Sequence, residues 1–255
     1  MLAALEFPPI ENLVEWPVYF EGTEGTLFAF NKIGLISFLA FLIPAFLFLI
    51  AGKDLVPRGV QNLMEMIVQF VERQVMMSAI GPDGRPYLAL LVSIFLFVFF
   101  GNIFEVIPTF HMPANARMAN PLILALIVWL TFIYAGFRNH GFGYLKDSLF
   151  PPGVPGPLYI LVTPIEFLST FLLRPFGLAV RLFANLLAGH ILLVTFGVIS
   201  VTLIINLNAL SIVFIPSFAM LVALTGFEIM VSFLQAYIFA LLAAVYIDSS
   251  LHPHH

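Results

Sequence analysis

Long runs of apolar residues, separated by short polar segments, form the main pattern of this 255-residue chain. The first three runs extend over about 28–51, 87–107 and 120–137. Each has close to the length of about 20 residues that a helix needs to cross the hydrocarbon core of a bilayer. The pattern therefore predicts three membrane-spanning helices in the first part of the chain, with Pro44 as a kink in the first of them.

Two much longer apolar stretches follow, over about 158–205 and 210–247. Their lengths of about 48 and 38 residues are nearly double the roughly 20 residues of one perpendicular span. Either each stretch contains an additional turn, for which Pro164 and Pro175 are candidates in the first, or both form long helices at a steep tilt. We favour the tilt, because no cluster of turn residues divides the first stretch. Since only a short link joins the two, we expect an antiparallel hairpin.

A more polar segment over 59–77 has the periodicity of a helix but cannot cross lipid. Its polar residues alternate with one apolar stripe made of Leu63, Met66, Ile67, Phe70 and Val71. A single apolar stripe at helical spacing indicates an amphipathic helix that lies at the membrane interface or packs against protein. The turn residues of 81–86 should end this helix.

Composition places the chain among integral membrane proteins. It is 61% hydrophobic and only 9% charged, whereas soluble domains carry about 25% charged residues. The chain has no cysteine, which excludes disulfides, thiolate catalysis and cysteine-ligated metals, and its net charge of −4 without a basic patch gives no indication of nucleic-acid binding. The fold class we expect is an all-α integral membrane protein with five membrane helices and one interfacial amphipathic helix.

The same pattern divides the chain into three units. Residues 1–27 form an acidic segment whose five Glu and lack of Lys or Arg resemble neither a signal peptide nor a transit peptide. Residues 28–150 hold the N-terminal helices. The Pro- and Gly-rich stretch 151–157 separates them from the long hairpin, so that the third unit is 151–255.

The distribution of positive charges predicts the orientation in the membrane. In this topology six basic residues fall on one side: Lys53, Arg58, Arg73, Arg85, Arg138 and Lys146. Only Lys32 and Arg117 fall on the other side. The acidic N-terminus should therefore lie outside the cell and the C-terminus inside.

Four formal charges interrupt the apolar region 158–247, namely Glu166, Arg174, Arg181 and Glu228. An arginine at the centre of a membrane helix costs roughly 2.5–3.5 kcal/mol, and its guanidinium does not escape this cost by losing a proton. Arg181 therefore needs an anionic partner or a polar cavity, and we expect it to be functional. Arg174 is better explained as a structural residue that snorkels or pairs locally.

Helical geometry, at about 100° per residue, sorts the polar residues of the hairpin into faces. Asn185 shares a face with Arg181, whereas His190 lies on the opposite side of the same helix. In the last helix, Glu228 and Gln235 belong to one stripe. His190 and Glu228 could therefore meet as a protonatable pair away from the permanent cation. Imidazole and carboxylate can relay protons, whereas arginine can only repel protons or attract an anion.

The residues of these two helices resemble a known family. Residues 181–190 read Arg-Leu-Phe-Ala-Asn-Leu-Leu-Ala-Gly-His, and further along Glu228 is followed by Gln235-Ala-Tyr-Ile-Phe-Ala. Together with Asn102 and the amphipathic second helix, they are similar to subunit a of F-type ATP synthases, and the similarity covers nearly the whole chain. The combined motif is highly specific, unlike any one of its parts.

The resemblance implies a role for each of these positions. Arg181 would be the stator arginine that faces the rotating ring of c subunits, with Asn185 beside it. One aqueous half-channel would be lined by polar residues from several helices: Asn102, Glu105, Glu228, His190 and Gln235. Many bacterial members have an acid at the position of His190 and a histidine at the position of Glu228. In this chain the two residue types are exchanged, in an arrangement that resembles mitochondrial members.

The second half-channel would contain Glu166, whose separation from Arg181 is one residue longer than in many members. A π-bulge could absorb this residue. A proton from the first half-channel would neutralise a carboxylate of a c subunit, which then rotates through lipid and releases the proton near Glu166. The expected partners are the c ring, the b subunits of the peripheral stalk, the remaining synthase subunits and bilayer lipid.

Two other classes of protein also hold polar residues in the membrane. A secondary ion or solute transporter remains the alternative, although the chain shows neither an inverted repeat nor matching broken helices. An intramembrane metallo-enzyme would need closely spaced ligands such as His-Glu-x-x-His, but His190 is the only histidine within the predicted spans. A nucleotide-binding protein would need a Gly-Lys-Ser/Thr loop, which the sequence does not contain. We therefore expect a subunit without catalytic activity of its own, without cofactor or metal.

The location that we expect is a bacterial plasma membrane, with an organelle-encoded chain as the alternative. The sequence leaves open whether protons or sodium ions are carried, the size of the ring and the direction of operation.

Overall fold

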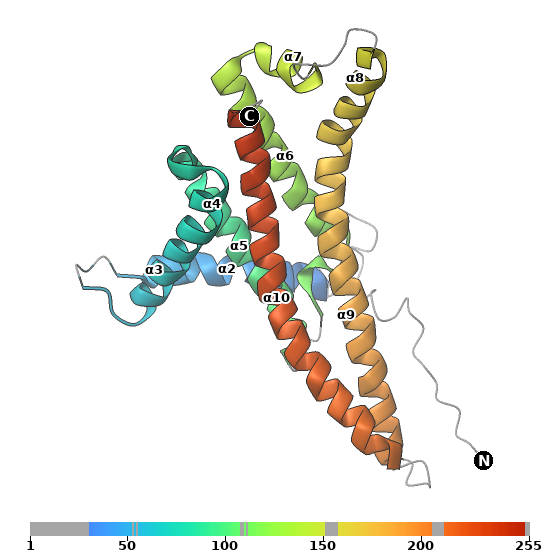
Figure 1. The fold of residues 1–255 in the computed structure, drawn as a ribbon. Helices are drawn as coiled ribbons and strands as arrows, with labels where there is room; N and C mark the ends of the chain where they lie inside the picture. The colour runs from blue at the N-terminus through green and yellow to red at the C-terminus, as the bar shows by residue number, and fades with distance from the viewer. Residues whose placement is uncertain are drawn as a thin grey trace.

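The computed structural model describes residues 31–52, 54, 56–107, 110, 112–150, 158–205 and 212–252. Within these ranges every regular element is a helix (Figure 1). Five helical segments are long and apolar enough to cross a membrane: Lys32–Ile50, Gly81–Ile103, Ala119–His140, Tyr159–Ile204 and Phe214–Leu251. The predicted all-α membrane class is therefore confirmed. The acidic segment 1–27 lies outside the described residues.

The first span is the helix α2 (Lys32–Ile50). It begins at Asn31, whose side chain accepts a hydrogen bond of 3.0 Å from the backbone N–H of Gly34. Such an N-cap satisfies one of the free N–H groups of the first turn. Only one stripe of α2 is buried, and it packs mainly against the next span, α5 (Leu88–Ile103). The remaining surface exposes large apolar side chains, as lipid contact requires.

The amphipathic segment is helical as predicted, and its apolar stripe is only partly buried against the rest of the chain. It consists of α3 (Val60–Val71), the π-helix η1 (Glu72–Met76) and α4 (Met77–Ala79). Leu63 and Met66 of the predicted stripe are exposed, whereas Gln61 is buried. The burial of this polar residue is possible because its amide donates to the Asp54 carbonyl at 2.8 Å and to the Glu65 carboxylate at 2.9 Å.

The second span begins earlier and ends earlier than predicted. Residues 81–86, which we expected to form a breaking loop, belong to the 3-10 helix η2 (Gly81–Tyr87), which leads directly into α5. A proline in a first helical turn is tolerated, because its missing N–H would have no partner there. At the other end α5 stops at Ile103, and residues 104–106 form turns. Glu105 therefore lies in a turn and not in the helix.

The third span is α6 (Ala119–His140), which extends a few residues beyond the predicted bounds. It ends at Gly141, whose φ of +57° is a conformation that glycine adopts without strain. A short helix that the sequence did not predict, α7 (Gly143–Leu149), follows. Its Tyr144 packs against Gly136, where an added Cβ would lie only 2.6 Å from the ring.

The two long apolar stretches form the predicted antiparallel hairpin. The first contains α8 (Tyr159–Leu168), the π-helix η5 (Ser169–Leu173) and α9 (Arg174–Ile205), and the second is α10 (Phe214–Leu251). Neither stretch contains an additional turn within its described residues. The 38 residues of α10 extend over about 57 Å, well beyond the roughly 30 Å of a hydrocarbon core.

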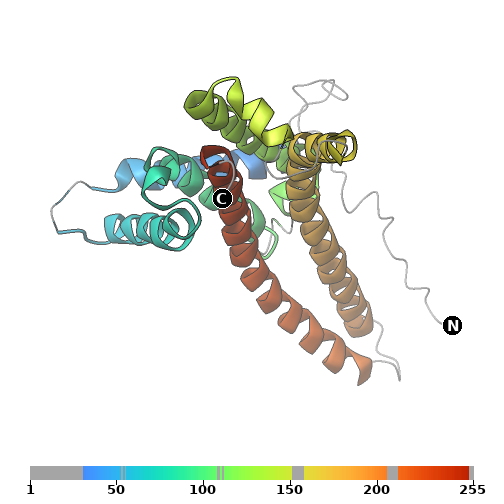
Figure 2. The ribbon, with the colours of Figure 1, turned by 45° about the horizontal axis from the view of Figure 1, so that its top comes forward.

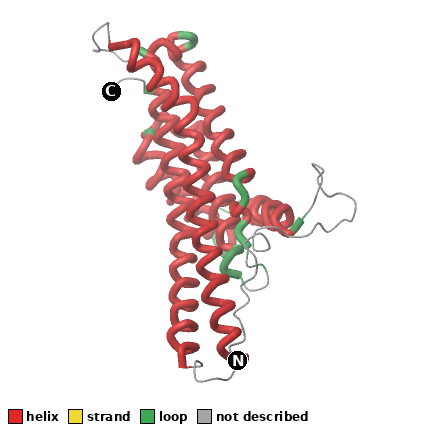
Figure 3. The backbone as a smooth tube through the Cα atoms, turned by 90° about the vertical axis from the view of Figure 1, so that its right-hand side faces the viewer, coloured by secondary structure: helices red, strands yellow, loops and turns green. Residues whose placement is uncertain are grey.

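The arrangement of the helices agrees with a tilted hairpin. Figures 1 and 3 show α2 crossing α9 and α10 instead of running beside them. The 19 residues of α2 extend over about 28 Å, so α2 fits a bilayer when it is nearly perpendicular to it. If α2 crosses directly, the hairpin that lies across it must be strongly tilted.

The core lies where α5, α6 and α9 meet α10. Four alanines of α10 are fully buried there: Ala236, Ala240, Ala243 and Ala244. Small side chains let neighbouring membrane helices approach closely. Figure 2 shows α3 and α4 on one side of α10 and α9 on the other. One long face of α9 therefore remains outside the bundle, since most of its residues are exposed or half-buried.

Candidate functional site

Arg181 lies on the exposed face of α9. The residues around it on this face are small or polar: Gly177, Ala184, Asn185 and Ala188. The opposite stripe is buried and consists of Leu178, Leu182 and Leu186. All salt bridges found among the described residues involve histidine, and none includes Arg181. The guanidinium is therefore available to a partner outside this chain.

One turn further along α9, a hydrogen bond joins the two helices of the hairpin. The Asn185 side-chain amide donates to the Gln235 carbonyl oxygen of α10 at 3.0 Å. Gln235 is buried, whereas Asn185 is exposed. The pair therefore connects the face of Arg181 with the interior of the hairpin.

Three ionisable side chains are buried together on the inner side of α9. Glu105 comes from the turn after α5, His190 from α9 and Glu228 from α10, and their exposed fractions are 1%, 5% and 4%. The Nδ1 atom of His190 lies 3.7 Å from the Oε1 atom of Glu105. The Glu228 carboxylate lies against Gly189, the residue before His190 on α9. We call these three residues the buried acid–histidine cluster.

Gly189 is what allows Glu228 to lie between α9 and α10. A Cβ added at Gly189 would overlap the Glu228 carboxylate, with the Glu228 Cδ atom only 2.6 Å away. A larger side chain at this position would therefore displace the Glu228 carboxylate. The glycine before His190 is therefore explained by its close contact with Glu228 of α10.

The predicted pair of His190 and Glu228 is part of a larger group. Both residues are buried in the same cluster, and the His190 Nδ1 atom also lies 3.7 Å from the Glu105 carboxylate. The Glu105 side chain, in the turn after α5, is almost fully buried. The angular prediction for α9 is confirmed, since Arg181 is exposed and His190 is buried.

A cavity of about 660 Å³ opens beside the cluster, between α9 and α10. Glu105 and His190 form part of its wall, and its far end reaches Ile204 and Phe214, where the hairpin turns. Most of the lining is apolar, with hydroxyl groups from Ser200, Thr202 and Thr225. The cavity is large enough for several water molecules.

Asn102 occupies a different environment from the cluster. It is fully buried, and its side-chain oxygen accepts a hydrogen bond of 2.8 Å from the Asn115 amide. Asn115 belongs to the 3-10 helix η3 (Ala114–Ala116), in the connection before α6. This contact ties the connection to the end of α5, next to the turn that carries Glu105. Asn102 therefore lies near Glu105 in the chain, and its hydrogen-bond partner is Asn115.

Glu166 and Arg174 lie on the other side of Arg181 along the chain. Glu166 is half-buried in α8, and its separation of 15 residues corresponds to about 22 Å of helix. The π-helix η5 lies between the two, as the extra residue in this interval suggested. We expected Arg174 to be a structural residue that snorkels or pairs locally; its Nη1 atom instead donates to a distant residue of the chain, the Ser249 hydroxyl of α10, at 3.0 Å.

Some features of the site had no signal in the sequence pattern. The hydroxyls of Ser200 and Ser217 form a buried hydrogen bond of 3.1 Å across the hairpin, near the far end of the cavity. Asn115 lies in the short polar segment between the second and third apolar runs. Both contacts depend on which helices meet, and a single polar residue in an apolar run does not reveal its partner. Among the described residues, no group of three His, Asp or Glu side chains could hold a metal ion.

The fold and the site define an all-α membrane protein in which an exposed arginine and a buried cluster of ionisable side chains lie on opposite sides of one long helix. The family model described as "ATP synthase A chain" matches residues 34–248. The ATP synthase subunit a of Rhodococcus erythropolis is 43% identical over 230 residues, which cover 88% of this chain and 84% of the relative.

Other bacterial relatives give the same result. The ATP synthase subunit a of a Parafrankia species is 42% identical over 252 residues, covering 96% of this chain and 84% of the relative. That of Mesorhizobium japonicum is 42% identical over 216 residues, covering 83% and 84%. The chain belongs to the ATP synthase A chain family. It is a stator subunit of the F0 sector that translocates protons in a membrane and is not catalytic by itself, and the transporter alternative is not favoured.

Proposed function

We propose that Arg181 is the group that meets the rotor, and that the rotor is a ring of c subunits, each with a carboxylate at membrane depth. Two observations support this role. The guanidinium is exposed on a helix that is otherwise apolar, and it has no salt bridge among the described residues. The neighbouring Gly177, Ala184 and Ala188 leave room for another helix to approach α9 closely.

The cavity beside the cluster is proposed as the first half-channel. Both carboxylate oxygens of Glu105 and one of Glu228 are buried without a hydrogen-bond donor among the described residues. A buried carboxylate without donors is costly, and either water from the cavity or a bound proton reduces this cost. The cluster would therefore accept protons from the cavity and pass them along Glu105, His190 and Glu228.

The next steps lie at the border between α9 and the rotor. Gln235 is on the same stripe of α10 as Glu228, and it receives the hydrogen bond of Asn185. We propose that these two amides separate the cluster from Arg181 while leaving a polar route to the c-subunit carboxylate. After the ring has turned, the carboxylate would release its proton into a second half-channel that contains Glu166. Asn102 would act indirectly, by holding the turn that carries Glu105.

Arg181 would prevent a direct leak between the two half-channels. Along α9 it lies about 14 Å from His190 and about 22 Å of helix from Glu166, so the cation stands between the two proposed routes. A fixed positive charge repels protons and attracts the deprotonated rotor carboxylate. Each charge that moves through 100 mV provides about 2.3 kcal/mol, so several protons must be coupled to one ATP.

The proposed setting is a bacterial plasma membrane, with the N-terminus outside and the C-terminus inside. The relatives are bacterial membrane subunits, and the positive charges favour this orientation. In this orientation the turn of the hairpin and the far end of the cavity face outward. The unit 151–255 would carry the proton path and 28–150 would support it. Besides the c ring, we propose the b subunits of the peripheral stalk and the other synthase subunits as partners, with lipid around them.

The exposed Arg181 guanidinium is the observation that carries the proposal, and Arg181→Ala is the test. The variant complex should assemble but lose ATP-driven proton pumping in inverted vesicles. Passive proton leak, measured in the same vesicles under an imposed potential, should rise or stay unchanged. Arg138→Ala, at the exposed end of α6, is the matched control and should pump normally. Normal pumping by Arg181→Ala would show that Arg181 does not have this role.

A further inference from the structure

Arg174 makes two contacts that join the beginning of α9 to the end of α10. Its Nη1 atom donates to the Ser249 hydroxyl at 3.0 Å, and its guanidinium carbon lies 5.6 Å from the centre of the Tyr246 ring. A guanidinium within about 6 Å of an aromatic face is attracted by the ring. The Arg174 charge is thus engaged inside the chain, in contrast to that of Arg181.

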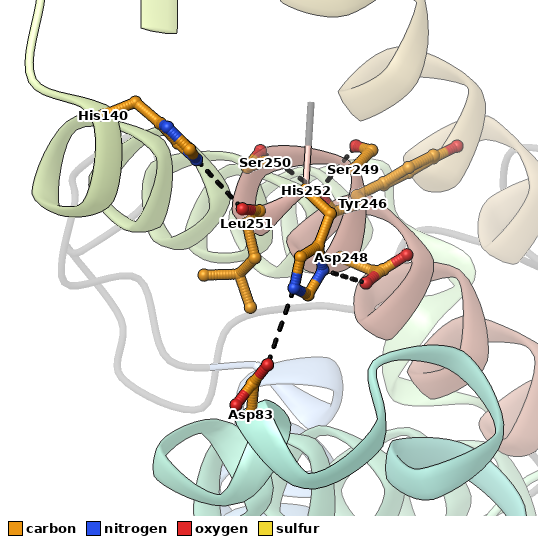
Figure 4. Close-up of polar contacts among 8 residues, drawn as sticks. All are labelled: Asp83, His140, Tyr246, Asp248, Ser249, Ser250, Leu251 and His252. Atoms are coloured by element: carbon orange, nitrogen blue, oxygen red, sulfur yellow. Dashed lines mark hydrogen bonds and ion pairs between the residues drawn. The ribbon is translucent and has the colours of Figure 1, made fainter. Parts of the chain in front are cut away.

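The end of α10 that receives Arg174 is anchored from several sides. Figure 4 shows Tyr246 and Ser249 on the last turns of α10, beside Leu251 and His252. The Leu251 carbonyl is bound by the His140 ring at 2.9 Å, which ties it to the end of α6. The Tyr144 hydroxyl of α7 lies 3.2 Å from the Ser250 hydroxyl in a buried contact. The Tyr246 ring also packs against that of Phe132 in α6.

A further contact at this end reaches the segment before α5. The His252 ring lies between two carboxylates, 2.9 Å from Asp248 and 3.5 Å from Asp83 of η2 (Figure 4). Exposed pairs of this kind contribute little individually. Together with the contacts to α6 and α7, however, they attach one short stretch of α10 to three other elements. The end of α10 therefore provides a fixed point for whatever binds to it.

The beginning of α9 lies directly after a change of helical register. Arg174 follows the π-helix η5, and its backbone N–H bonds to the carbonyl of Ser169, the first residue of that element. A π-helical turn contains an extra residue relative to the α-helix, so α9 presents a different face from the one that an uninterrupted continuation of α8 would present. Contacts between α9 and its neighbours can stabilise this rotation.

Two polar contacts with α10 bracket Arg181 on α9. Arg174 lies two turns before Arg181 and about 20° around the axis from it, and Asn185 lies one turn after it and about 40° away in the same direction. Both donate to α10. Arg181 itself is just beyond the edge of this interface. If α9 turned by about 30°, a point on the helix surface, 5–6 Å from the axis, would move by about 3 Å.

We propose that Arg174 is a positioning residue that fixes the rotation of α9, and thereby the direction in which Arg181 faces, by binding Tyr246 and Ser249 on the anchored end of α10. This inference rests on the proposed function of Arg181. Misplacement of a reacting group by 1 Å can reduce a rate by about a hundredfold. A partial loss of the Arg174 contact, with Asn185 still bound, should therefore reduce coupling without abolishing it.

The test compares Arg174→Gln with Arg174→Lys in the assembled synthase. Arg174→Gln should lower ATP-driven proton pumping per assembled complex about three- to tenfold, because the cation that binds the ring and the hydroxyl is lost. Arg174→Lys keeps a cationic donor and should recover much of this loss. Arg138→Gln controls for the removal of a positive charge. Pumping is normalised to complex content, so a simple loss of assembly does not count as support.

A second comparison tests whether Arg174 acts through α10. Tyr246→Leu should reduce pumping more than Tyr246→Phe, which keeps the ring. The double variant Arg174→Gln with Tyr246→Leu should be no worse than the poorer single variant, whereas independent effects would multiply. The ratio of passive leak to coupled pumping should rise in the impaired variants, as expected when Arg181 faces the wrong way.

The outcomes separate this inference from the proposed function. If Arg181→Ala abolishes pumping but Arg174→Gln pumps normally, the positioning role is wrong and the role of Arg181 stands. If Arg181→Ala pumps normally, the proposed function fails and the positioning role fails with it. Multiplicative effects of Arg174→Gln and Tyr246→Leu would also overturn the inference.

Discussion

Gly189→Ala is the sharpest test of the buried acid–histidine cluster, because it adds a single methyl group at the contact between α9 and α10. The added Cβ would lie 2.6 Å from the Cδ atom of Glu228, whereas carbon atoms in contact are about 3.5–4.0 Å apart. The carboxyl group, or α9 as a whole, must therefore move by about 1 Å. The end of a side chain moves more easily than a helix, so we expect Glu228 to be displaced first.

The expected result is a loss of proton flux with little loss of the fold. Overpacking costs about 1–3 kcal/mol, which a large membrane bundle can absorb, and alanine favours a helix over glycine by about 1 kcal/mol. A displacement of about 1 Å can reduce a rate by up to a hundredfold. We expect ATP-driven pumping per assembled complex to fall about tenfold. Passive proton flux through F0 should fall with it, because the block lies in the half-channel.

A matched control and a rescue variant make the result specific. Gly226→Ala adds the same methyl group in α10, where no atom lies within 4 Å of the added Cβ, and should leave pumping unchanged. Combining Gly189→Ala with Glu228→Asp shortens the displaced side chain by one methylene group and should restore part of the flux. If Gly189→Ala pumps normally, the position of Glu228 against α9 does not matter for proton transfer, and the proposed cluster is wrong.

Three further predictions test other parts of the molecule. Glu228→Gln should slow proton flux without preventing assembly, and normal flux per complex would remove Glu228 from the path. Gly197 lines the cavity, and no atom lies within 4 Å of a Cβ added there. Gly197→Leu should therefore fill part of the proposed first half-channel and reduce passive proton flux, whereas an unchanged flux would contradict the assignment of this cavity. Gly136→Ala places a Cβ 2.6 Å from the Tyr144 ring and should lower the free energy of unfolding in detergent by about 1–3 kcal/mol. Unchanged thermal stability would show that this contact does not hold α7.

The fold was largely predictable because lipid imposes strong constraints on sequence. Apolar runs near 20 residues predicted α2, α5 and α6, and the two long runs predicted the hairpin of α9 and α10. The bounds were less accurate where the apolar pattern continues past a helix end. The apolar run of the second span extends to Ile107, yet α5 ends at Ile103 and a turn follows.

The amphipathic segment shows what pattern analysis leaves open. Its apolar stripe did not decide between a helix at the membrane interface and one packed against protein, because in a membrane protein apolar residues can face lipid while a paired polar residue is buried. Leu63 is exposed and Gln61 is buried, because the Gln61 amide has two acceptors within the chain. The π-helix η1 further shifts the faces of this segment, and no residue type predicts such a turn.

The candidate site was predictable along one helix and less so between helices. The spacing from Arg181 to His190 was sufficient to place them on opposite faces of α9, since only helical geometry is needed. The partners of these residues depend on contacts across the bundle. Glu105 binds His190, and Arg174 binds the end of α10, because of how α5, α9 and α10 pack. A single sequence contains no direct information on those contacts.

The separation between Arg181 and the cluster has an electrostatic consequence. His190 lies nine residues further along α9 and about 180° around it, so the two charged ends are roughly 17 Å apart. At an effective dielectric constant of about 20, unit charges at this distance interact by about 1 kcal/mol, compared with about 4 kcal/mol at 4 Å. Arg181 could therefore act strongly on the proposed rotor carboxylate at contact distance, while its electrostatic interaction with a charge at His190 would be weak. One helix can in this way present a permanent cation and a proton-exchanging group without either cancelling the other, provided that its rotation is fixed.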